Sequence, residues 1–213
     1  MANHALADQA ATLRRAAGFE SRPAEALEKL LKKHSGTQQL VLLQDFPDPD
    51  ALSAAWAYRL IAGAYNIQCD IFYSGTLSHQ ENIALVKLTN LPAKRWPTAP
   101  KDAPDLTQYQ GYVLIDTQGT TSHLTEKVKE AELPLILVID HHAIQGKLDA
   151  EMADIRPEIH ATATMMTQYL QAGLIQLDRS NSHHVKCATA LLHGLRSDTS
   201  HLMQASEPEL LAA

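Results

Sequence analysis

Short apolar runs alternate along this chain with longer segments of helical character. Residues 40–43, 112–115 and 135–139 are continuous apolar runs, which predict strands buried on both faces. Strands of this kind, joined by helices, form a mostly parallel sheet. The pattern therefore predicts an α/β fold, with helices on both faces of the sheet and a site at the carboxyl ends of the strands. A further strand is predicted at residues 71–73, and helices at residues 21–33, 51–64, around 83–86, 124–131, 161–172 and 182–195.

The segment before the first predicted strand is helix-prone throughout. Residues 1–20 are rich in Ala, and leucines then recur at helical spacing up to residue 33. We therefore predict an N-terminal helical extension at residues 1–36, followed by an α/β domain at residues 37–213. Residues 90–110 carry four prolines and are predicted to be a surface connection.

Acidic residues follow directly after three of the predicted strands. The carboxyl ends of parallel strands meet at one edge of a sheet, and carboxylates that converge there repel each other unless a cation neutralises them. Oxygen and imidazole ligands together suit Mn²⁺, Mg²⁺, Fe²⁺ or Zn²⁺, whereas the lack of thiolates argues against a structural zinc site. In chain order, the residues at the strand ends are Asp48 and Asp50, then Asp116, then Asp140, His141 and His142.

Each of these features has a simpler explanation when it is taken alone. Asp48 and Asp50 precede a predicted helix, where carboxylates cap amide groups. Asp116 could head a turn, and adjacent histidines in a loop are often solvated. Residues 194–199 follow a predicted helix and add Asp198, although surface charge at a helix end would explain it equally well. Three separate strands that end in these residue types nevertheless favour one shared metal site.

Four motifs follow one another along the chain: Pro47-Asp48-x-Asp50-Ala51, a strand followed by Asp116, Asp140-His141-His142, and Gly194-x-Arg196-Ser197-Asp198-Thr199. Their order resembles that of the DHH phosphoesterase superfamily, over about residues 38–200. That family includes RecJ-type nucleases, oligoribonuclease/pAp phosphatases, cyclic-dinucleotide phosphodiesterases and family II pyrophosphatases. Residues 78–82 and 154–157 are similar to segments of the RecJ-related branch of oligonucleotide or exopolyphosphate phosphoesterases.

The resemblance implies a role for each of these residues. Two divalent cations, Mn²⁺ or an alternative such as Mg²⁺, would activate a water for attack on phosphorus. The implied metal ligands are Asp48 for the first ion, Asp50, His141 and Asp198 for the second, and Asp116 between them. The implied catalytic residues are His142, facing the scissile phosphate, and Asp140, orienting the histidine pair. Candidates for substrate contact are Arg196 and Arg156, from their charge, and His160, Thr162 and Thr164 as pocket residues.

The chain departs from the family pattern in two ways. The first motif normally begins with a histidine four residues before its first Asp, and here that position is Gln44. An amide oxygen is a poorer ligand than imidazole, so we expect a weakened first metal site. Asp45 is not expected to substitute, because strand neighbours point to opposite faces. The smaller C-terminal substrate-binding domain of the nuclease branch has no counterpart after Asp198, so we expect that domain to be absent.

Charge and composition narrow the choice of partner. Lys and Arg number 18 against 24 Asp and Glu, a formal net charge of −6, and aromatic residues make up only 5%. This balance disfavours long nucleic acid and favours a small phosphorylated substrate, such as a short oligonucleotide, a nucleotide phosphate or polyphosphate. Apolar runs of about five residues are far short of a bilayer span, so no membrane partner is expected. With no secretory signal and no disulfide framework, a cytoplasmic protein is expected, and a homodimer is left open.

The sequence thus predicts metal-dependent hydrolysis of a phosphoester or phosphoanhydride. Two alternatives stay open. Gln44 and the missing substrate-binding domain would also suit a DHH-fold binding or regulatory module that has lost turnover. The chain could also be a fragment that needs a missing second domain for activity.

Overall fold

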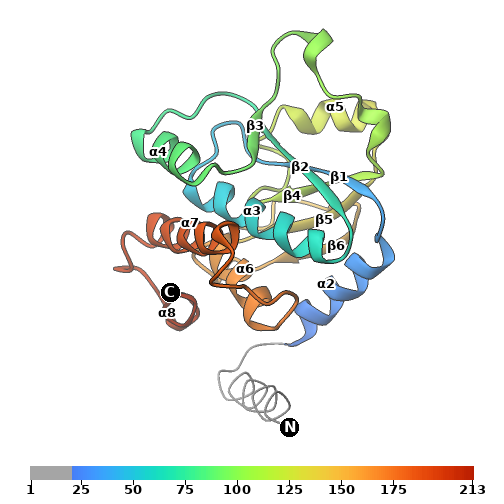
Figure 1. Ribbon diagram of the computed structural model, residues 1–213. Coiled ribbons are helices and arrows are strands. Elements are labelled where there is room, and N and C mark those ends of the chain that lie inside the picture. The colour runs from blue at the N-terminus through green and yellow to red at the C-terminus, as the bar shows by residue number, and fades with distance from the viewer. Residues whose placement is uncertain (1–20) are drawn as a thin grey trace.

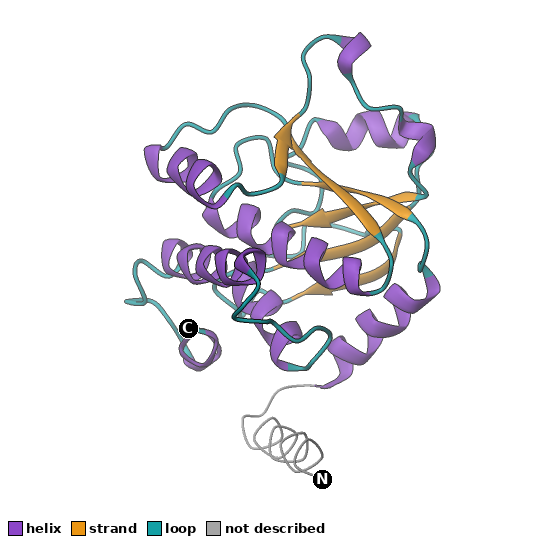
Figure 2. Ribbon diagram, in the orientation of Figure 1, coloured by secondary structure: helices purple, strands orange, loops and turns teal. Residues whose placement is uncertain are grey.

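The computed structural model describes residues 21–213, so the predicted helix-prone segment 1–20 lies outside the described residues. The strands form one sheet in which every neighbouring pair is parallel. This confirms the predicted α/β fold (Figures 1 and 2). The strands are β1 (Gln38–Leu42), β2 (Gln68–Tyr73), β3 (Ala93–Arg95), β4 (Gly111–Ile115), β5 (Leu135–Asp140) and β6 (Ala150–Ile155), in the spatial order β3-β2-β1-β4-β5-β6.

The predicted helices agree with observed helices to within a few residues. Among the described residues, the unpredicted elements are the two edge strands, β3 and β6, the C-terminal helix α8 (Glu207–Ala212) and two short 3-10 helices. β3 has only three residues and lies in the proline-rich connection, while β6 alternates half-buried and exposed positions. Neither strand has the continuous apolar run of a central strand, which is why the hydrophobic pattern did not reveal them. The helices are α2 (Ser21–Lys33), α3 (Pro49–Ala64), α4 (Gln80–Thr89), α5 (Leu124–Glu130), α6 (Thr162–Gln171), α7 (Ser182–Asp198) and α8 (Glu207–Ala212).

Both faces of the sheet are covered, and the central strands contribute to both layers. In β1, Val41 belongs to the core shared with α2, α3, α6 and α7, whereas Leu40 and Leu42 belong to the core shared with α5. All three side chains are fully buried. The alternation follows from the period of two along a strand, and burial on both sides explains the unbroken apolar runs.

The predicted N-terminal extension is integrated into this core where the structure describes it. Leu27 and Leu31 of α2 are buried in the same cluster as residues of α3 and α6.

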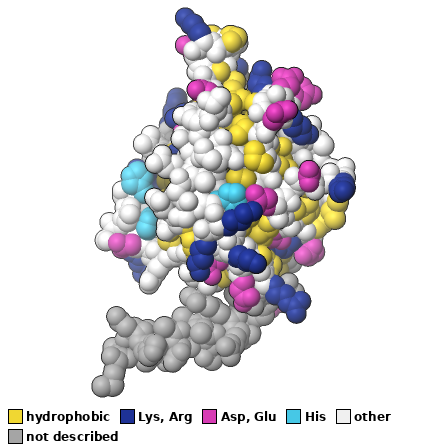
Figure 3. Space-filling model, turned by 90° about the vertical axis from the view of Figure 1, so that its right-hand side faces the viewer, with side chains coloured by type: hydrophobic (Ala, Val, Ile, Leu, Met, Phe, Trp, Pro, Cys, Tyr) yellow, Lys and Arg dark blue, Asp and Glu magenta, His cyan; other side chains and the backbone are white. Residues whose placement is uncertain are grey.

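Within residues 21–213, no helix combines the length and the hydropathy that crossing a membrane requires. On the face shown in Figure 3, Lys and Arg side chains are interspersed with Asp and Glu side chains.

The strand order creates a switch point between β1 and β4. The chain moves outward from β1 to β2 and β3 on one side, and from β4 to β5 and β6 on the other. Parallel sheets of this order bind ligands in the crevice beyond the carboxyl ends of the strands at the switch point. The acidic residues identified from the sequence follow β1, β4 and β5 at this position.

Candidate metal centre

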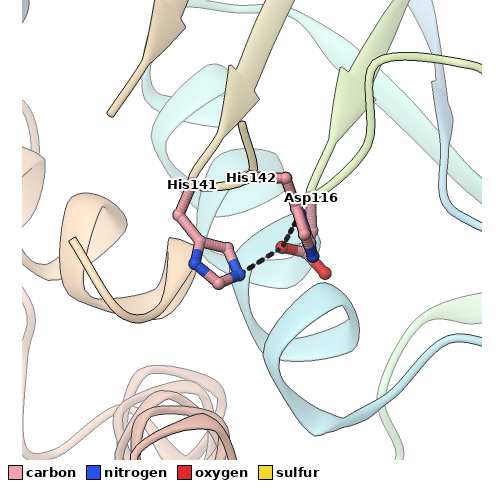
Figure 4. Close-up of side chains that lie close together, drawn as sticks. All are labelled: Asp116, His141 and His142. Carbon is pink, nitrogen blue, oxygen red and sulfur yellow. Dashed lines mark ion pairs between the residues drawn. The ribbon is translucent and has the colours of Figure 1, made fainter. Parts of the chain in front are cut away.

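The carboxyl ends of β4 and β5 bring an aspartate and two histidines together. Asp116 follows β4, and His141 and His142 follow β5, its direct neighbour. Figure 4 shows the His141 ring pointing toward the Asp116 carboxylate, and its dashed lines mark the ion pairs of Asp116 with the two histidines. Nε2 of His141 lies 3.5 Å from Oδ1 of Asp116, and Nδ1 of His142 lies 3.9 Å from the same oxygen.

Two more carboxylates approach the same imidazole nitrogen from the helices. Nε2 of His141 lies 3.4 Å from Oδ2 of Asp198 at the end of α7, and 3.9 Å from Oδ2 of Asp50 in the first turn of α3. Two three-residue groups result, each with ligand atoms within 4.8 Å of one another. These groups are Asp50, His141 and Asp198, and Asp116, His141 and His142.

Asp50 is held in place by the start of another helix. Its Oδ2 accepts a hydrogen bond from the backbone N–H of Thr162 and its Oδ1 from that of Ala163, both at 2.7 Å. These N–H groups belong to the first turn of α6 and have no partner within their own helix. Asp50 therefore caps α6 and faces the cluster at the same time.

Asp116 adopts a backbone conformation that non-glycine residues rarely adopt. Its φ is +59°, and its N–H donates to the carbonyl of Ile139 at 2.9 Å. The Thr162 hydroxyl donates to its Oδ1 at 2.8 Å. A left-handed aspartate costs of the order of 1 kcal/mol, and such strain concentrates at functional sites.

Helix α7 reaches the cluster because one of its residues has no side chain. A Cβ at Gly194 would lie 2.4 Å from Oγ of Ser53 and 2.8 Å from the carbonyl oxygen of Pro49. Gly194 therefore lets α7 touch the start of α3. Asp198 follows four residues later on the same face of the helix and so reaches His141.

Burial and mutual repulsion alter the ionisation of this cluster. Burial, together with the charges of Asp198 and Asp48, raises the pKa of Asp50 to about 8. Burial and the charge of Asp50 also raise the pKa of Asp116 well above its usual value. Burial opposes the charging of His141, but its contacts with Asp198 and Asp50 outweigh that effect and raise its pKa to about 9. Without a cation, the cluster therefore holds protons at neutral pH.

The cluster fits a divalent cation. Oδ2 of Asp116 and Nε2 of His141 are buried polar atoms that have no hydrogen-bond partner among the described residues. Nδ1 of His141 lies 3.2 Å from the carbonyl oxygen of Ile159, and donation to that oxygen leaves the Nε2 lone pair of the neutral ring directed at the carboxylates. A bound cation would satisfy both atoms and neutralise the acidic groups.

Asp48 and Gln44 lie at the edge of the cluster. Asp48 is the N-cap of α3, where its Oδ1 accepts from the Ala51 N–H at 2.9 Å. Nε2 of Gln44 lies 3.4 Å from the other oxygen, Oδ2. Burial and the charge of Asp198 raise the pKa of Asp48. Gln44 thus presents an N–H donor to Asp48, where a neutral histidine would offer a lone pair to a cation.

Asp45 faces away from this group, as the alternation of strand neighbours predicts. Its Oδ1 accepts from the backbone N–H of His123 at 3.0 Å, and its Oδ2 contacts the Nδ1 atom of the same residue. Asp45 therefore anchors the start of α5 on the other side of the sheet.

His142 is paired with Asp140. Nδ1 of His142 lies 2.8 Å from Oδ1 of Asp140, whose side chain is fully buried. Burial disfavours the charge on Asp140, but the hydrogen bonds from His142 and Gln118 keep its pKa below the usual value. The contact with Asp140 in turn raises the pKa of His142. The imidazole side chain is 47% exposed, so it is accessible from solvent.

Three of the candidates for substrate contact, Arg156, Arg196 and His160, occupy different environments. The Arg156 guanidinium binds both oxygens of Asp154 and donates to Gln168 at 2.7 Å. Arg196 is exposed, two positions before Asp198 on α7 and hence about 200° around the helix from it. His160 is exposed and lies two residues before Thr162, whose backbone binds Asp50. Of these three residues, only His160 is both exposed and close in sequence to a residue whose backbone binds Asp50.

Two residues near the site were not singled out from the sequence. Gln118 is buried and binds Asp140, and Glu209 of α8 binds the backbone N–H of His160 at 3.0 Å. Gln118 follows Asp116 by two positions, and this proximity to an aspartate at a strand end could have marked it as a residue of the site. Glu209 had no such signal, because its contact depends on how α8 folds back onto the domain.

The protein is thus a parallel α/β domain with a cluster of carboxylates and histidines at the carboxyl ends of its strands. The chain belongs to the DHH family. It matches the N-terminal domain of that family over residues 39–195, which includes all the cluster residues except Asp198.

Three known proteins illustrate this relationship. An uncharacterized protein of Methanocaldococcus jannaschii is 36% identical over 163 residues, which cover 76% of this chain and 30% of the relative. The fold resembles an exopolyphosphatase-related protein from Bacteroides fragilis, with a TM-score of 0.64, 12% identity and coverage of 89% of this chain and 54% of that one. It also resembles a putative family II inorganic pyrophosphatase of Methanococcus jannaschii, with a TM-score of 0.54, 18% identity and coverage of 82% and 53%. The chain spans about a third of the curated relative and about half of each solved structure.

Proposed function

We propose that this protein is a metal-dependent phosphohydrolase that cleaves a phosphoester or phosphoanhydride bond in a small anionic substrate. The observation that carries the proposal is the convergence of Asp50, Asp116 and Asp198 on Nε2 of His141, within 3.9 Å. Like charges held this close in a buried site favour a cation as the missing partner. Membership of the DHH family supports the same chemistry.

The donor set suits Mn²⁺, with Mg²⁺ as an alternative. Asp50, His141 and Asp198 would hold one ion, Asp48 would serve a second, and Asp116 would contribute to both. When bound, a divalent cation lowers the pKa of coordinated water and neutralises charge on phosphate oxygens. We expect weaker binding at the Asp48 position, because Gln44 places an amide group beside that carboxylate.

His142 is the proposed general acid. Its Nδ1 is held by Asp140, so its Nε2 is the nitrogen left to meet the substrate. There it would bind the phosphate and donate a proton to the leaving oxygen. Asp140 keeps the ring oriented and stabilises its charged form.

His160 is the proposed substrate contact of the three candidates. Glu209 anchors its backbone, and the ring lies 3.3 Å from the same carboxylate through Nδ1, which leaves Nε2 for an anionic group. Arg156 is less suited, because its guanidinium already binds Asp154 and Gln168.

The substrate class follows from charge and from the solved structures of the same fold. The net charge of −6 disfavours a long nucleic acid and leaves short oligonucleotides, nucleotide phosphates and polyphosphate. The structures named as exopolyphosphatase-related and as a putative pyrophosphatase add inorganic polyphosphate and pyrophosphate to the set worth assaying. We place the protein in the cytoplasm, in keeping with its buried and unpaired Cys69 and Cys187.

A binding or regulatory module without turnover is the second candidate. It is favoured by the Gln44–Asp48 contact, since an impaired first metal position could leave ligand binding intact while hydrolysis is lost.

One assay separates the two candidates. Purified protein with Mn²⁺ is offered dinucleotides, pAp, pyrophosphate, polyphosphate and bis-p-nitrophenyl phosphate, alongside the Asp116→Asn and Asp45→Asn variants. Asp45→Asn is a matched control, because Asp45 lies in the same loop after β1 but contacts His123 instead of the cluster. Hydrolysis that needs Mn²⁺, is lost in Asp116→Asn and persists in Asp45→Asn supports the enzyme. Binding without hydrolysis supports the module, and neither binding nor hydrolysis overturns both.

A further inference from the structure

Gln118 is buried, and both the nitrogen and the oxygen of its side-chain amide form hydrogen bonds. Its Nε2 donates to Oδ2 of Asp140 at 2.7 Å and to the carbonyl of Ala143 at 3.0 Å. Its Oε1 accepts from the backbone N–H of Gln145 at 2.8 Å. The carboxylate and the carbonyl can only accept and the N–H can only donate, so the orientation of the amide follows from its partners.

These contacts fix the plane of the Asp140 carboxylate. Gln118 holds Oδ2, and the other oxygen, Oδ1, lies 2.8 Å from Nδ1 of His142 and accepts from its backbone N–H at 3.3 Å. With one oxygen bound, the carboxylate cannot rotate freely about its last bond, and Oδ1 stays aimed at the imidazole.

Gln118 also anchors the backbone that carries the histidine pair. Residues 142–145 are exposed, and Gln118 reaches this segment at the carbonyls of His142 (3.5 Å) and Ala143 and at the N–H of Gln145. Gln118 itself is held by a tight turn, in which the Gly119 N–H donates to Oγ1 of Thr117 at 3.1 Å. The turn after β4 therefore secures the loop after β5 through this one side chain.

We propose that Gln118 is a positioning residue that keeps the Asp140–His142 pair in the arrangement needed for His142 to act on substrate. The catalytic consequence rests on the proposed function, whereas the effect on His142 itself does not. A glutamine is specifically suited to this position. A glutamate carboxylate would place an acceptor where Asp140 and two carbonyl oxygens need a donor. A leucine side chain would supply no donor at all.

The first test measures the tautomer of the His142 ring and does not require that any substrate is hydrolysed. The ring nitrogens of ¹⁵N-labelled full-length protein with Mg²⁺ are observed by long-range ¹H–¹⁵N correlation at alkaline pH, where a neutral ring shows its tautomer. Wild type is expected to show His142 protonated at Nδ1, and Gln118→Leu to show a mixture with the Nε2 tautomer. Gln39→Leu is the matched control, because Gln39 is also buried but bonds Tyr58 at 2.6 Å instead.

If Gln118→Leu does not fold, the same measurement is made on Gln118→Met, which keeps the length of the side chain but forms neither hydrogen bond. A wild-type His142 pattern in the folded variant would overturn the proposal. If hydrolysis is found, kcat should fall about tenfold or more in Gln118→Leu while KM and Mn²⁺ affinity change little, as expected for a residue that acts through a general acid. A change confined to KM would also count against it. If no substrate is hydrolysed, the proposed function fails and the tautomer measurement still decides the role of Gln118.

Discussion

A Cβ atom on Gly194 would lie only 3.0 Å from the Cα of Asp50, so the backbones of α7 and α3 meet at a proposed metal ligand. No side chain fits between them. The same contact sets how far α7 reaches toward the strand ends, and Asp198 lies at its last position. Packing and metal binding are therefore coupled at this point.

Gly194→Ala is expected to destabilise the protein and to weaken metal binding. The new methyl group would meet Ser53 and the Pro49 carbonyl, and overpacking of this kind costs about 1–3 kcal/mol. Displacement of α7 would also move Asp198 away from His141 and lower Mn²⁺ affinity. Urea unfolding and a Mn²⁺ titration measure the two effects.

Gly63→Ala is the matched control for that substitution. Gly63 also lies in a helix, α3, but a Cβ there would meet nothing within 4 Å. Alanine at such a position should stabilise the helix by about 0.5–1 kcal/mol and leave Mn²⁺ affinity unchanged. Equal stability of the two variants would contradict the account of α3–α7 packing.

Metal binding is expected to release protons at neutral pH. The pKa of Asp50 is about 8 and that of His141 about 9 in the metal-free protein, both above their ordinary values. A cation must displace these protons, so Mn²⁺ affinity should rise as the pH rises toward about 9. Calorimetric titration in two buffers of different ionisation enthalpy measures the protons released, and a value of zero would refute the described ionisation.

The same two groups make the metal-free protein less stable at alkaline pH. The folded state keeps a proton on Asp50 between about pH 4 and 8, and on His141 between about pH 6.5 and 9, which the unfolded chain has lost. Because the folded state binds more protons, the free energy of unfolding falls as pH rises through these ranges. The urea midpoint should therefore be lower at about pH 9 than at about pH 6, and saturating Mn²⁺ should reduce the difference.

Gln44→His is expected to tighten binding at the first metal position. The imidazole would replace an amide that donates to Asp48 and would offer a lone pair beside that carboxylate. A Mn²⁺ titration of both forms measures stoichiometry and affinity, with Gln108→His, on an exposed 3-10 turn, as the control. Identical stoichiometry and affinity in wild type and Gln44→His would disprove this prediction.

His160→Ala is expected to raise KM about tenfold with little change in kcat, because a hydrogen bond to a charged substrate group is lost in both ground and transition states. Arg196→Ala should change neither constant, since Arg196 lies on the side of α7 away from Asp198. The reverse outcome would assign the contact to Arg196 instead. Steady-state kinetics on the substrate found in the assay panel gives both values.

The central part of the fold could be predicted because its strands are buried on both faces. Residues 40–43 and 135–139 show this as unbroken apolar runs, and their parallel pairing explains why the acids that follow them meet. The edge strand β6 could not be found in this way, because its side chains alternate between half-buried and exposed positions.

Contacts that depend on tertiary packing could not be predicted from the sequence. Capping of α6 by Asp50 joins residues that are far apart in the chain, and no local pattern indicates it. The charge of Arg156 makes it a candidate for substrate contact, but its pairing with Asp154 becomes evident only from the folded geometry of β6 and the loop after it.

The most direct test of the metal centre is an equilibrium Mn²⁺ titration of wild type, Asp116→Asn and Asp45→Asn, followed by electron paramagnetic resonance of free Mn²⁺. We expect saturable binding to wild type, affinity lower by about tenfold or more in Asp116→Asn, and wild-type affinity in Asp45→Asn. Equal affinity in wild type and Asp116→Asn, or no saturable binding to wild type, would contradict a metal centre at the carboxyl ends of β1, β4 and β5.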